Sequence, residues 1–479
     1  MCAKRQLRLP FLLYFLYSFL IEIMSKLNIV ILAAGKGTRM HSIKPKVLHE
    51  IGGKPILGHV IDCAKALKPQ KIIVVYGYGG EIVREAFAHE TIIWVNQAEQ
   101  HGTGHAVQQA VPHLDDNANT LILLGDVPLV DIDACKKLVE QANNKLAILS
   151  FNKPDPTGYG RIVRSGSGNV TAIVEHKDAT EAQRKIIEVN TGMMAMPNVQ
   201  LKNWLNRLTN NNAQGEYYLT DIVEFAVQDS VDVVAKITPD EWSVTGINSK
   251  SDLSAIERVH QSRIAQQLLI QGVTLKDPTR LDVRGNLTCG RDVEIDINCV
   301  FEGDVILADK VSIAANCVIK NAVIAAGTQI LPFTLIDDAK IGANSRVGPY
   351  ARIRPGTVLQ CETHVGNFVE LKNVQVDIGS NINHLSYVGD AVVGKNVNIG
   401  AGTITCNYDG ANKHRTTIED GAFIGSDTQL IAPVTVGKNA TIAAGSTISK
   451  DVPAGGLTVC RAKEQKTYPS WQRPVKIKK

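Results

Sequence analysis

Residues 341–372 read IGANSRVGPYARIRPGTVLQCETHVGNFVELK, and an aliphatic residue returns at every sixth position of this stretch. The same spacing occurs before it and after it. The repeating residues are Ile295, Phe301, Leu307, Ile313 and Ile319; Ile341, Val347, Ile353, Leu359, Val365 and Leu371; and Ile424, Leu430, Val436, Ile442 and Ile448. A sustained six-residue period is the signature of a parallel β-helix, in which each aliphatic side chain stacks on its equivalent one coil away. The pattern predicts this fold for residues 272–479.

One segment, TCNYDGANKHRTTIED at 405–420, interrupts the period. Insertions in solenoid proteins emerge as loops on one face, which is often the binding face. The closing stretch RAKEQKTYPSWQRPVKIKK is basic and lacks the period, so we expect it to form a tail over the last coils.

Residues 249–271 contain neither glycine nor proline. An apolar stripe with helical spacing runs through them, formed by Leu253, Ile256, Ile264 and Leu268. Ser249 or Ser251 can cap the start of a helix. We expect one linker helix, about 30 Å long at the usual rise per residue, that bridges two domains.

From residue 28 to about 248, short apolar runs alternate with stretches of helical spacing. The predicted strands are NIVILAA, KIIVVYGYG, TIIWVNQ, TLILLGDVPLV and LAILSF, and the clearest helical stretches are PILGHVIDCAKAL and IDACKKLVEQA. Strands that alternate with helices predict a mostly parallel, Rossmann-like α/β sheet covered on both faces. Ligands of such sheets bind at the carboxyl ends of the strands.

The composition limits the classes of partner. A net charge of +4 over 479 residues is too small to indicate nucleic acid or a membrane as the main partner. Nine dispersed cysteines without a C-x-x-C pair argue against a disulfide framework or a zinc site, and they favour a reducing cytoplasm.

The first 23 residues, MCAKRQLRLPFLLYFLYSFLIEI, have a basic start and a short apolar run without a small-residue cleavage site. We expect Met24 to be the true start, with a membrane-tethered form as the alternative. The predicted organisation is thus an extension at 1–23, an α/β domain at 24–248, the linker helix at 249–271 and the β-helix at 272–479.

The stretch NIVILAAGKGTRM at 28–40 is a candidate phosphate-binding loop. It is not a Walker A motif, because Gly37 follows the lysine, and it lacks the third glycine of the dinucleotide fingerprint, because Met40 stands there. Gly35 and Gly37 let backbone N–H groups approach a phosphate or a base, and Arg39 offers a fixed cation. The alternative is a tight strand-to-helix turn with a surface arginine.

Two neighbouring motifs strengthen the first interpretation. KPKVLHEIGGKPIL supplies Lys46, and LLGDVPLV supplies Asp126 at a predicted strand end. Together with the loop they resemble the sugar nucleotidyltransferase family. The motifs NQAEQHGTGHA, DPTGYGRIVR, IVEHKDA, EVNTGM and NNNAQGEYYLTDIV extend the likeness. Residues 26–479 as a whole resemble the bacterial bifunctional enzymes that combine UDP-N-acetylglucosamine pyrophosphorylase with glucosamine-1-phosphate N-acetyltransferase.

This resemblance implies a left-handed β-helix and two reactions. Glucosamine 1-phosphate is acetylated by acetyl-CoA, and UMP then passes from UTP to N-acetylglucosamine 1-phosphate, which yields UDP-N-acetylglucosamine and pyrophosphate for peptidoglycan and lipopolysaccharide precursors. The family implies a cytoplasmic homotrimer, with the acetyltransferase site between β-helices.

For the uridylyl reaction the nucleophile is already an anion, so catalysis rests on alignment and charge neutralisation. The resemblance implies that Arg39 and Lys46 neutralise the triphosphate, that Asp126 and Asn248 hold Mg²⁺, and that Gln97, Gly102 and Thr103 read uracil. Further nucleotide or sugar contacts are expected at Leu32, Ala33, Ala34, Gly35, Leu124, Gly125, Gly160, Glu175 and Asn190. Leu124 departs from the tyrosine of close relatives, and we expect this position to act through its backbone.

For acetyl transfer, the motifs YARIRPG, NFVELK, NHLSYVGD and TCNYDG place polar residues on coils that do not need them for packing. Histidine suits a general base near neutral pH, and His384 matches the family's base, with Glu370 as its expected orienting group. The sugar phosphate is expected on Arg354, Lys372, Tyr387 and Asn398. Acetyl-CoA is expected on Ala401, Asn407, Tyr408, Ser426, Ala444 and Arg461.

Three alternatives remain at this point. His384 could pack between coils while the cations lie on a solvated face. A one-activity enzyme, such as those making ADP-glucose, carries a β-helix for assembly only. A non-catalytic scaffold, like the related subunits of a eukaryotic translation exchange factor, would be expected to lose charged residues such as Arg39 and Lys46.

Overall fold

The computed structural model describes residues 26–461, so the predicted extension and most of the basic tail lie outside the described residues. The chain divides into two compact units, Met1–Glu257 and Arg258–Lys479. Among the described residues, no helix is both long and apolar enough to cross a membrane.

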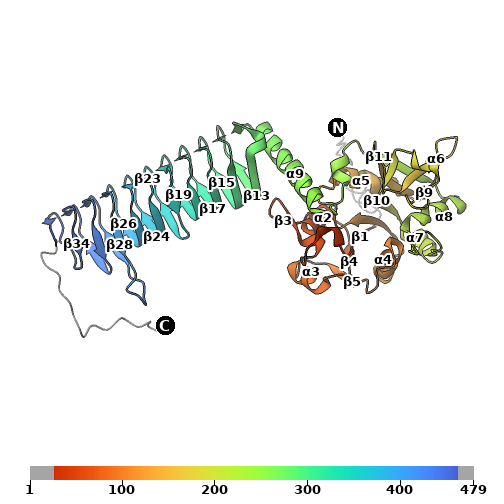
Figure 1. Ribbon diagram of the computed structural model, residues 1–479, viewed down its shortest axis with the longest axis horizontal. Coiled ribbons are helices and arrows are strands. Elements are labelled where there is room, and N and C mark those ends of the chain that lie inside the picture. The colour runs from red at the N-terminus through yellow and green to blue at the C-terminus, as the bar shows by residue number, and fades with distance from the viewer. Residues whose placement is uncertain (1–25, 462–479) are drawn as a thin grey trace, which may run out of the picture. The chain divides into compact units, whose positions relative to one another are not determined.

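The N-terminal unit is built on a nine-stranded sheet with the main order β11-β7-β10-β6-β1-β4-β5 (Figure 1). Its strands are β1 (Lys26–Ala33), β4 (Lys71–Tyr76), β5 (Ile93–Asn96), β6 (Ala118–Leu124), β7 (Leu146–Asn152), β8 (Arg161–Arg164), β9 (Val170–Val174), β10 (Glu188–Pro197) and β11 (Val233–Ile237). Strand β1 is parallel to β4 and β6, whereas β10 runs antiparallel to β6 and β7. The mostly parallel α/β sheet is confirmed, and β10 adds an antiparallel strand that was not predicted.

Alternating side chains of β1 explain why the sheet is covered on both faces. Ile29 and Ile31 belong to one buried apolar cluster and Val30 to another, since successive side chains of a strand point to opposite faces. The unit's helices are α2 (Ile56–Ala66), α3 (Gly80–Ala86), α4 (Thr103–Ala110), α5 (Ile132–Gln141), α6 (Glu181–Arg184), α7 (Asn198–Leu205) and α8 (Ile222–Gln228). Residues of α2 and α5 pack with Ile29 and Ile31, and those of α4, α7 and α8 pack with Val30.

Helix α9 spans Lys250–Ile270. Its start is fixed by a reciprocal cap, in which the Asp252 N–H donates to Ser249 Oγ and the Ser249 N–H donates to the Asp252 carboxylate. The same carboxylate accepts from the N–H of Asn248, which therefore has a fixed position just before the helix.

The C-terminal unit is a parallel β-helix, and the fold predicted from the six-residue period is confirmed (Figure 1). Its first sheet contains β12 (Thr274–Leu275), β14 (Glu294–Ile295), β16 (Ser312–Ile313), β18 (Gln329–Ile330), β20 (Arg346–Val347), β23 (His364–Asn367), β25 (Asn381–His384), β27 (Asn398–Ile399), β30 (Phe423–Ile424), β33 (Thr441–Ile442) and β35 (Leu457–Thr458). The second contains β13 (Leu281–Cys289), β15 (Cys299–Leu307), β17 (Val318–Ile324), β19 (Leu335–Ile341), β21 (Arg352–Ile353), β22 (Thr357–Leu359), β24 (Glu370–Val376), β26 (Tyr387–Val393), β28 (Ile404–Cys406), β29 (Thr416–Ile418), β31 (Gln429–Ile431), β32 (Val434–Val436) and β34 (Thr447–Ile448).

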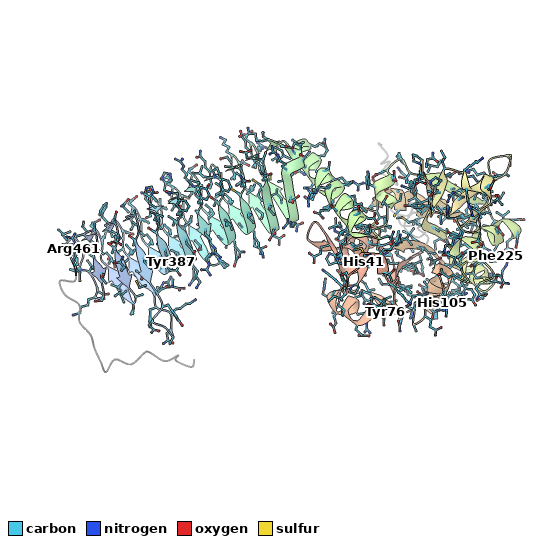
Figure 2. All side chains as sticks on the ribbon, in the orientation of Figure 1. His41, Tyr76, His105, Phe225, Tyr387 and Arg461 are labelled. Atoms are coloured by element: carbon cyan, nitrogen blue, oxygen red, sulfur yellow. The ribbon has the colours of Figure 1, made fainter. Side chains whose placement is uncertain are left out.

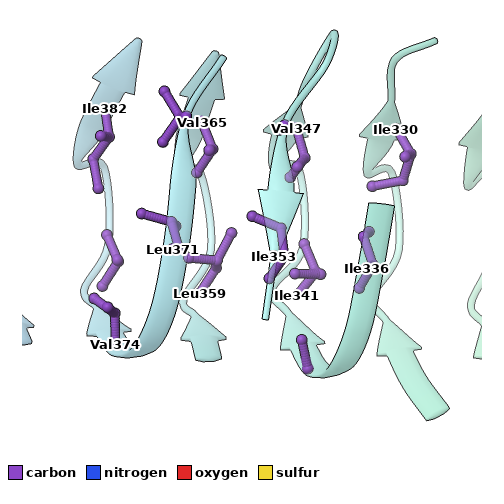
Figure 3. Close-up of a cluster of buried hydrophobic side chains, with 14 of the residues drawn as sticks. Ile330, Ile336, Ile341, Val347, Ile353, Leu359, Val365, Leu371, Val374 and Ile382 are labelled. Carbon is purple, nitrogen blue, oxygen red and sulfur yellow. The ribbon is translucent and has the colours of Figure 1, made fainter. Parts of the chain in front are cut away.

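The repeating aliphatic residues fill the core of this unit. Ile330, Val347, Val365 and Ile382 stack from coil to coil, because the parallel register pairs each of them with the next (Figure 3). Each is at most 1% exposed, so the residues that follow the six-residue period are the core residues. The coil that begins at Ile399 is longer than its neighbours, since it pairs with Ile424 and contains the predicted insertion.

Candidate active sites

The predicted phosphate loop follows β1. Gly37 adopts a left-handed conformation with φ 59°, and a Cβ atom there would lie 2.8 Å from Cβ of Lys46. Glycine is therefore required at this position for the loop to pass Lys46. A Cβ atom on Gly35 would meet no protein atom within 4 Å, and Arg39 is exposed at the end of the loop.

Lys46 connects two segments that are distant in sequence. Its Nζ lies 2.6 Å from Oδ2 of Asp126 and 3.3 Å from Oδ1 of Asn248. Asp126 follows β6, and its backbone carbonyl accepts from the N–H of Ile247, which brings the segment before α9 to the carboxyl end of the sheet. Gly125 allows this arrangement, because a Cβ atom there would lie 3.1 Å from the Leu32 carbonyl.

These groups border a cleft of about 310 Å³ whose lining includes Arg39, Leu124, Asp126 and Asn248. Two oxygen atoms, from Asp126 and Asn248, converge on one cation, the Lys46 ammonium, so this pair offers the hard oxygen ligands that suit Mg²⁺. No group of three or more His, Cys, Asp or Glu side chains in the described part of the chain could hold a metal. A metal here would take its other ligands from water and phosphate.

The three residues expected to hold the sugar lie together. The N–H of Asn190 donates to the Gly160 carbonyl, and a Cβ atom on Gly160 would lie 3.4 Å from Oε1 of Glu175. Glu175 accepts a hydrogen bond of 3.0 Å from the Thr220 hydroxyl, and burial raises the pKa of this carboxyl group. The side chain of Leu124 packs near Gly192 and lines the cleft.

The residues expected to read uracil surround the start of α4. Gln97 is 3% exposed, and its Nε2 donates to the carbonyl of Gly102. Gly102 has φ 105°, and a Cβ atom there would lie 2.6 Å from the Tyr217 carbonyl. Thr103 accepts the N–H of Leu219 through its hydroxyl, so the two loops are held together.

In the β-helix, register places the expected phosphate-binding cations on adjacent coils. The N–H of Arg354 donates to the carbonyl of Leu371, and Lys372 follows directly. Arg354 also donates to Glu370 Oε1 at 2.7 Å. In this chain Arg354 engages the Glu370 carboxylate and a different residue engages the histidine, so the orienting role expected of Glu370 stays a prediction.

That residue is Asn367. Its Oδ1 lies 2.9 Å from Nδ1 of His384, and the two residues are direct register partners. An amide oxygen accepts, so Nδ1 carries the proton and Nε2 keeps a lone pair. His384 is exposed, and its free nitrogen can accept a proton from a substrate amine.

The residues expected to bind acetyl-CoA continue the column that begins at His384. Ile382, Ile399, Ile424 and Ile442 are successive register partners. His384, Ala401, Ser426 and Ala444 each come two residues after one of them, so they occupy equivalent positions on four consecutive coils. Arg461 lies next to the last residue of this column, since its Nη2 donates to the Ala444 carbonyl at 2.8 Å. Tyr387 and Arg461, which bracket this region, are labelled in Figure 2.

The insertion forms a compact loop between β28 and β29. Asp409 accepts from the N–H groups of Ala411 and Asn412 and lies 2.7 Å from Nε2 of His414. The hydrogen bond from the Asn412 backbone and those from His414 and Ala411 hold the pKa of Asp409 well below its usual range. Tyr408, at the exposed tip, donates to the Gly410 carbonyl.

Two residues of this loop contact residues near the expected sugar-phosphate site. Asn407 donates to Asp390 at 2.5 Å, and a Cβ atom on Gly389 would lie 2.4 Å from the hydroxyl of Tyr387 and 2.9 Å from Nδ2 of Asn407. Lys413 lies beside Lys372, whose ammonium lowers the pKa of Lys413. Neither lysine forms an ion pair with a described carboxylate.

Three residues of this site were missed by sequence reasoning, namely Asn367, Gly389 and Lys413. Asn367 and Gly389 stand inside the motifs NFVELK and NHLSYVGD, and Lys413 stands inside the insertion at 405–420. Only the coil register or the fold of the insertion distinguishes them from their neighbours. Asn398 is the one expected sugar contact that the chain does not bring to the others. It is on β27, where it pairs with Asn381 and Phe423, and its side chain makes no hydrogen bond to Tyr387 or His384 in the described structure.

Comparisons with known proteins agree with both units. The family model of the MobA-like NTP transferase domain matches residues 29–191, the GMPPB C-terminal domain matches 283–378, and the bacterial transferase hexapeptide (six repeats) matches 415–450. Curated relatives named bifunctional protein GlmU match along nearly their whole length. The chain is 64% identical to the protein of Methylobacillus flagellatus over 95% of this chain and 99% of the relative. It is 59% identical to that of Cupriavidus pinatubonensis over 94% and 99%, and to that of Nitrosospira multiformis over 95% and 99%.

The fold and the sites define a two-domain transferase, with a nucleotidyltransferase unit and a hexapeptide-repeat transferase unit. The chain belongs to the family of bifunctional GlmU proteins. It is a bifunctional uridylyltransferase and acetyltransferase, which confirms the expected function. The one-activity enzyme and the non-catalytic scaffold are thereby excluded as alternatives.

Proposed function

We propose that the N-terminal unit joins UTP to N-acetylglucosamine 1-phosphate and that the β-helix acetylates glucosamine 1-phosphate with acetyl-CoA. The observation that carries this proposal is that one chain has two separate sets of charged groups. Arg39, Lys46 and Asp126 meet at the carboxyl end of a parallel sheet. Arg354, Lys372 and His384 belong to a corner of the β-helix.

In the uridylyl reaction, a phosphate oxygen of the sugar attacks the α-phosphorus of UTP, and the bond to pyrophosphate breaks. Arg39 and Lys46 neutralise charge on the triphosphate, and Asp126 and Asn248 hold Mg²⁺. The metal supplies further charge neutralisation when bound. Gly160, Glu175 and Asn190 hold the sugar, and Gln97, Gly102 and Thr103 hold the base.

In the acetyl reaction, the sugar amine attacks the thioester carbonyl of acetyl-CoA. The C–N bond forms and the amine proton passes to Nε2 of His384. The C–S bond breaks, and the departing CoA thiolate takes up that proton to leave as the thiol. Arg354, Lys372 and Lys413 hold the sugar phosphate, a dianion that favours several cations. The small side chains of Ala401, Ser426 and Ala444 leave room for acetyl-CoA along the column, and Arg461 suits its phosphates.

Purified protein incubated with glucosamine 1-phosphate, UTP and Mg²⁺ tests both halves. We expect mass spectrometry to find UDP-N-acetylglucosamine only when acetyl-CoA is added. His384→Ala should abolish acetyl transfer and leave uridylyl transfer unchanged. Equal loss of both activities in this variant would contradict separate sites. If the wild-type protein converted supplied N-acetylglucosamine 1-phosphate but did not acetylate glucosamine 1-phosphate, the β-helix would have no catalytic role.

We also propose that the protein is a homotrimer. The β-helices of its three chains would associate through an apolar ladder, defined as Phe333, Tyr350, Phe368 and Leu385. These side chains are 42%, 47%, 55% and 63% exposed. The ring centroids of Phe333 and Tyr350 lie 4.9 Å apart, and those of Tyr350 and Phe368 lie 5.2 Å apart. A contiguous exposed apolar surface of this kind favours association.

Two further features support this interface. All four ladder residues have positive φ, between 50° and 60°. Bulky side chains are disfavoured there by roughly 1–2 kcal/mol each, so their presence needs a compensating contact. Leu385 and Phe368 directly follow His384 and Asn367, so a partner on the ladder would lie next to the base.

Phe368→Asn tests the interface, because asparagine occupies the equivalent left-handed corner at Asn316. We expect light scattering to show dissociation, together with loss of acetyl transfer and retention of uridylyl transfer. A trimer of unchanged mass and full activity would contradict the assignment.

We place the enzyme in the cytoplasm, where it would supply precursors of peptidoglycan and lipopolysaccharide. The eight cysteines of the described residues are all free thiols, which fits a reducing compartment.

A further inference from the structure

Arg161 is a buried cation without a carboxylate partner. It is the first residue of β8 and directly follows Gly160, it is 1% exposed, and it forms no ion pair within the described residues. Arginine is seldom buried without a paired anion, because a charge removed from water is costly. Burial and the nearby Arg184 lower the pKa of its guanidinium, and Asp155 and Glu175 act in the opposite direction. The guanidinium keeps its proton in proteins, so Arg161 brings a positive charge into the interior beside the expected sugar site.

The guanidinium group donates to three neutral acceptors. Its Nη1 donates to the carbonyl of Tyr159. Its Nη2 lies 3.1 Å from Nδ1 of His176, after β9, and 3.5 Å from the carbonyl oxygen of Arg184, at the end of α6. Arginine can only donate, so Nδ1 of His176 is an acceptor. Because the group is planar and one branch is anchored on two other segments, the direction of the Tyr159 carbonyl is fixed.

The Tyr159 carbonyl belongs to the same peptide unit as the N–H of Gly160. A trans peptide is planar, and its C=O and N–H groups point in opposite directions. The Gly160 carbonyl accepts from the N–H of Asn190, so both peptide units that flank Gly160 are fixed. Arg161 therefore directs the Gly160 N–H away from its own guanidinium.

This N–H is a buried donor without an acceptor. Gly160 is buried, and its N–H donates to no group of the residues that the structure describes. Unpaired buried N–H groups are rare in native proteins. The three residues before it, 157–159, line the cleft that also contains Asp126. A ligand oxygen at this edge of the cleft would supply the missing acceptor.

We propose that Arg161 is a positioning residue for the sugar phosphate, which holds the peptide unit between Tyr159 and Gly160 so that the Gly160 N–H donates to a sugar oxygen. The guanidinium acts through the peptide unit and does not itself contact the substrate. Its charge also polarises the peptide group and makes the N–H a stronger donor. This inference rests on the proposed uridylyl function and on Gly160 as a residue that holds the sugar.

The test compares Arg161→Met and Arg161→Lys with the wild type and with Arg164→Met as a matched control. Methionine has no donor, and lysine keeps the charge but lacks the planar fork. Arg164 is an exposed arginine at the other end of β8 and is paired with Glu188. Calorimetry gives Kd for UDP-N-acetylglucosamine and for UDP, which lacks the sugar. Kinetics give KM for N-acetylglucosamine 1-phosphate and for UTP, and thermal unfolding checks the fold of each variant.

We expect Arg161→Met to weaken binding of UDP-N-acetylglucosamine about tenfold and to leave Kd for UDP unchanged, because one hydrogen bond from a buried donor is lost. KM for N-acetylglucosamine 1-phosphate should rise by a similar factor, and KM for UTP should not change. Arg161→Lys should change the same quantities about threefold in the same direction, since its ammonium cannot span the separate acceptors. Arg164→Met should match the wild type.

Two results would overturn the inference while leaving the proposed function intact. One is a folded Arg161→Met variant with the wild-type Kd for UDP-N-acetylglucosamine. The other is an equal loss of affinity for UDP and for UDP-N-acetylglucosamine, which would show that Arg161 only supports the fold. If Arg161→Met does not fold, the same two criteria decide on Arg161→Lys, which keeps the buried cation and a donor. A wild-type protein that transfers nothing from UTP would instead overturn the proposed function, and the inference with it.

Discussion

Oδ1 of Asn367 lies 2.9 Å from Nδ1 of His384, one coil away on the same corner of the β-helix. The contact follows from the register of β23 and β25, so the same repeat that packs the core also orients the base. It leaves Nε2 as the free nitrogen that can accept a proton.

Asn367→Ala should lower kcat of acetyl transfer about tenfold, because the ring loses the group that fixes its tautomer, and general base catalysis contributes about 10²–10⁴-fold in all. Asn367→Asp keeps an acceptor oxygen beside Nδ1 and should retain more activity than Asn367→Ala. Both are measured as kcat of acetyl transfer. Uridylyl transfer by the same preparations is the control, and an unchanged kcat in Asn367→Ala would show that the contact is dispensable.

Lys413→Ala should raise KM for glucosamine 1-phosphate about tenfold, because a charge-assisted contact to a phosphate is lost. The adjacent Lys372 ammonium lowers the pKa of Lys413, and Asp390 acts in the opposite direction, so the two lysine side chains lie close together beside one carboxylate. Lys395→Ala removes an exposed lysine of the same β-helix and serves as the control. An equal KM in the two variants would remove Lys413 from the site.

Much of this organisation could be predicted from the sequence, because two of its determinants are local. Ile341 and Val365 follow the six-residue period that predicts a parallel β-helix. The continuous apolar run of β1 predicts a strand that is buried on both faces. The antiparallel strand β10 could not be predicted, since its residues EVNTGMMAMP pair with strands far away in the sequence.

The residues of the two candidate sites also differ in whether the sequence alone singles them out. Lys46 and Asp126 stand out because charged residues interrupt apolar segments. Asn367 and Lys413 do not, since their roles depend on which residue lies one coil away or on how a loop folds back. Glu370 is a further example, because the sequence does not show that its carboxylate accepts from Arg354.

Asp221→Asn should stabilise the N-terminal unit at neutral pH. Burial, together with Glu224, Glu175 and Asp178, raises the pKa of Asp221 from its ordinary 3.8 to about 6. The folded state therefore favours the protonated acid, and ionisation costs stability progressively from about pH 4 to about pH 6 and by a constant amount above.

We expect a gain of about 1–2 kcal/mol at pH 7 to 8 that disappears below about pH 4. Denaturation of the two proteins across this range measures it. Glu140→Gln, at an exposed carboxylate of α5, is the control, and a gain for Asp221→Asn that does not depend on pH would contradict the explanation.

The two glycines of the phosphate loop should respond differently to alanine. A Cβ atom at Gly37 would lie 2.8 Å from Cβ of Lys46, in a backbone with φ 59°. Gly37→Ala should therefore displace Lys46, lower the thermal stability and reduce kcat of uridylyl transfer at least tenfold, with roughly 1–2 kcal/mol of backbone strain contributing.

Gly35→Ala should leave the stability unchanged, because a Cβ atom there meets no protein atom within 4 Å. If the nucleotide occupies that space, the added methyl group must raise KM for UTP while kcat changes less. Unfolding curves and UTP kinetics on the two variants separate the roles. A Gly35→Ala enzyme with wild-type KM would remove this glycine from the nucleotide site, and Gly37 would then act only by giving Lys46 room beside Asp126.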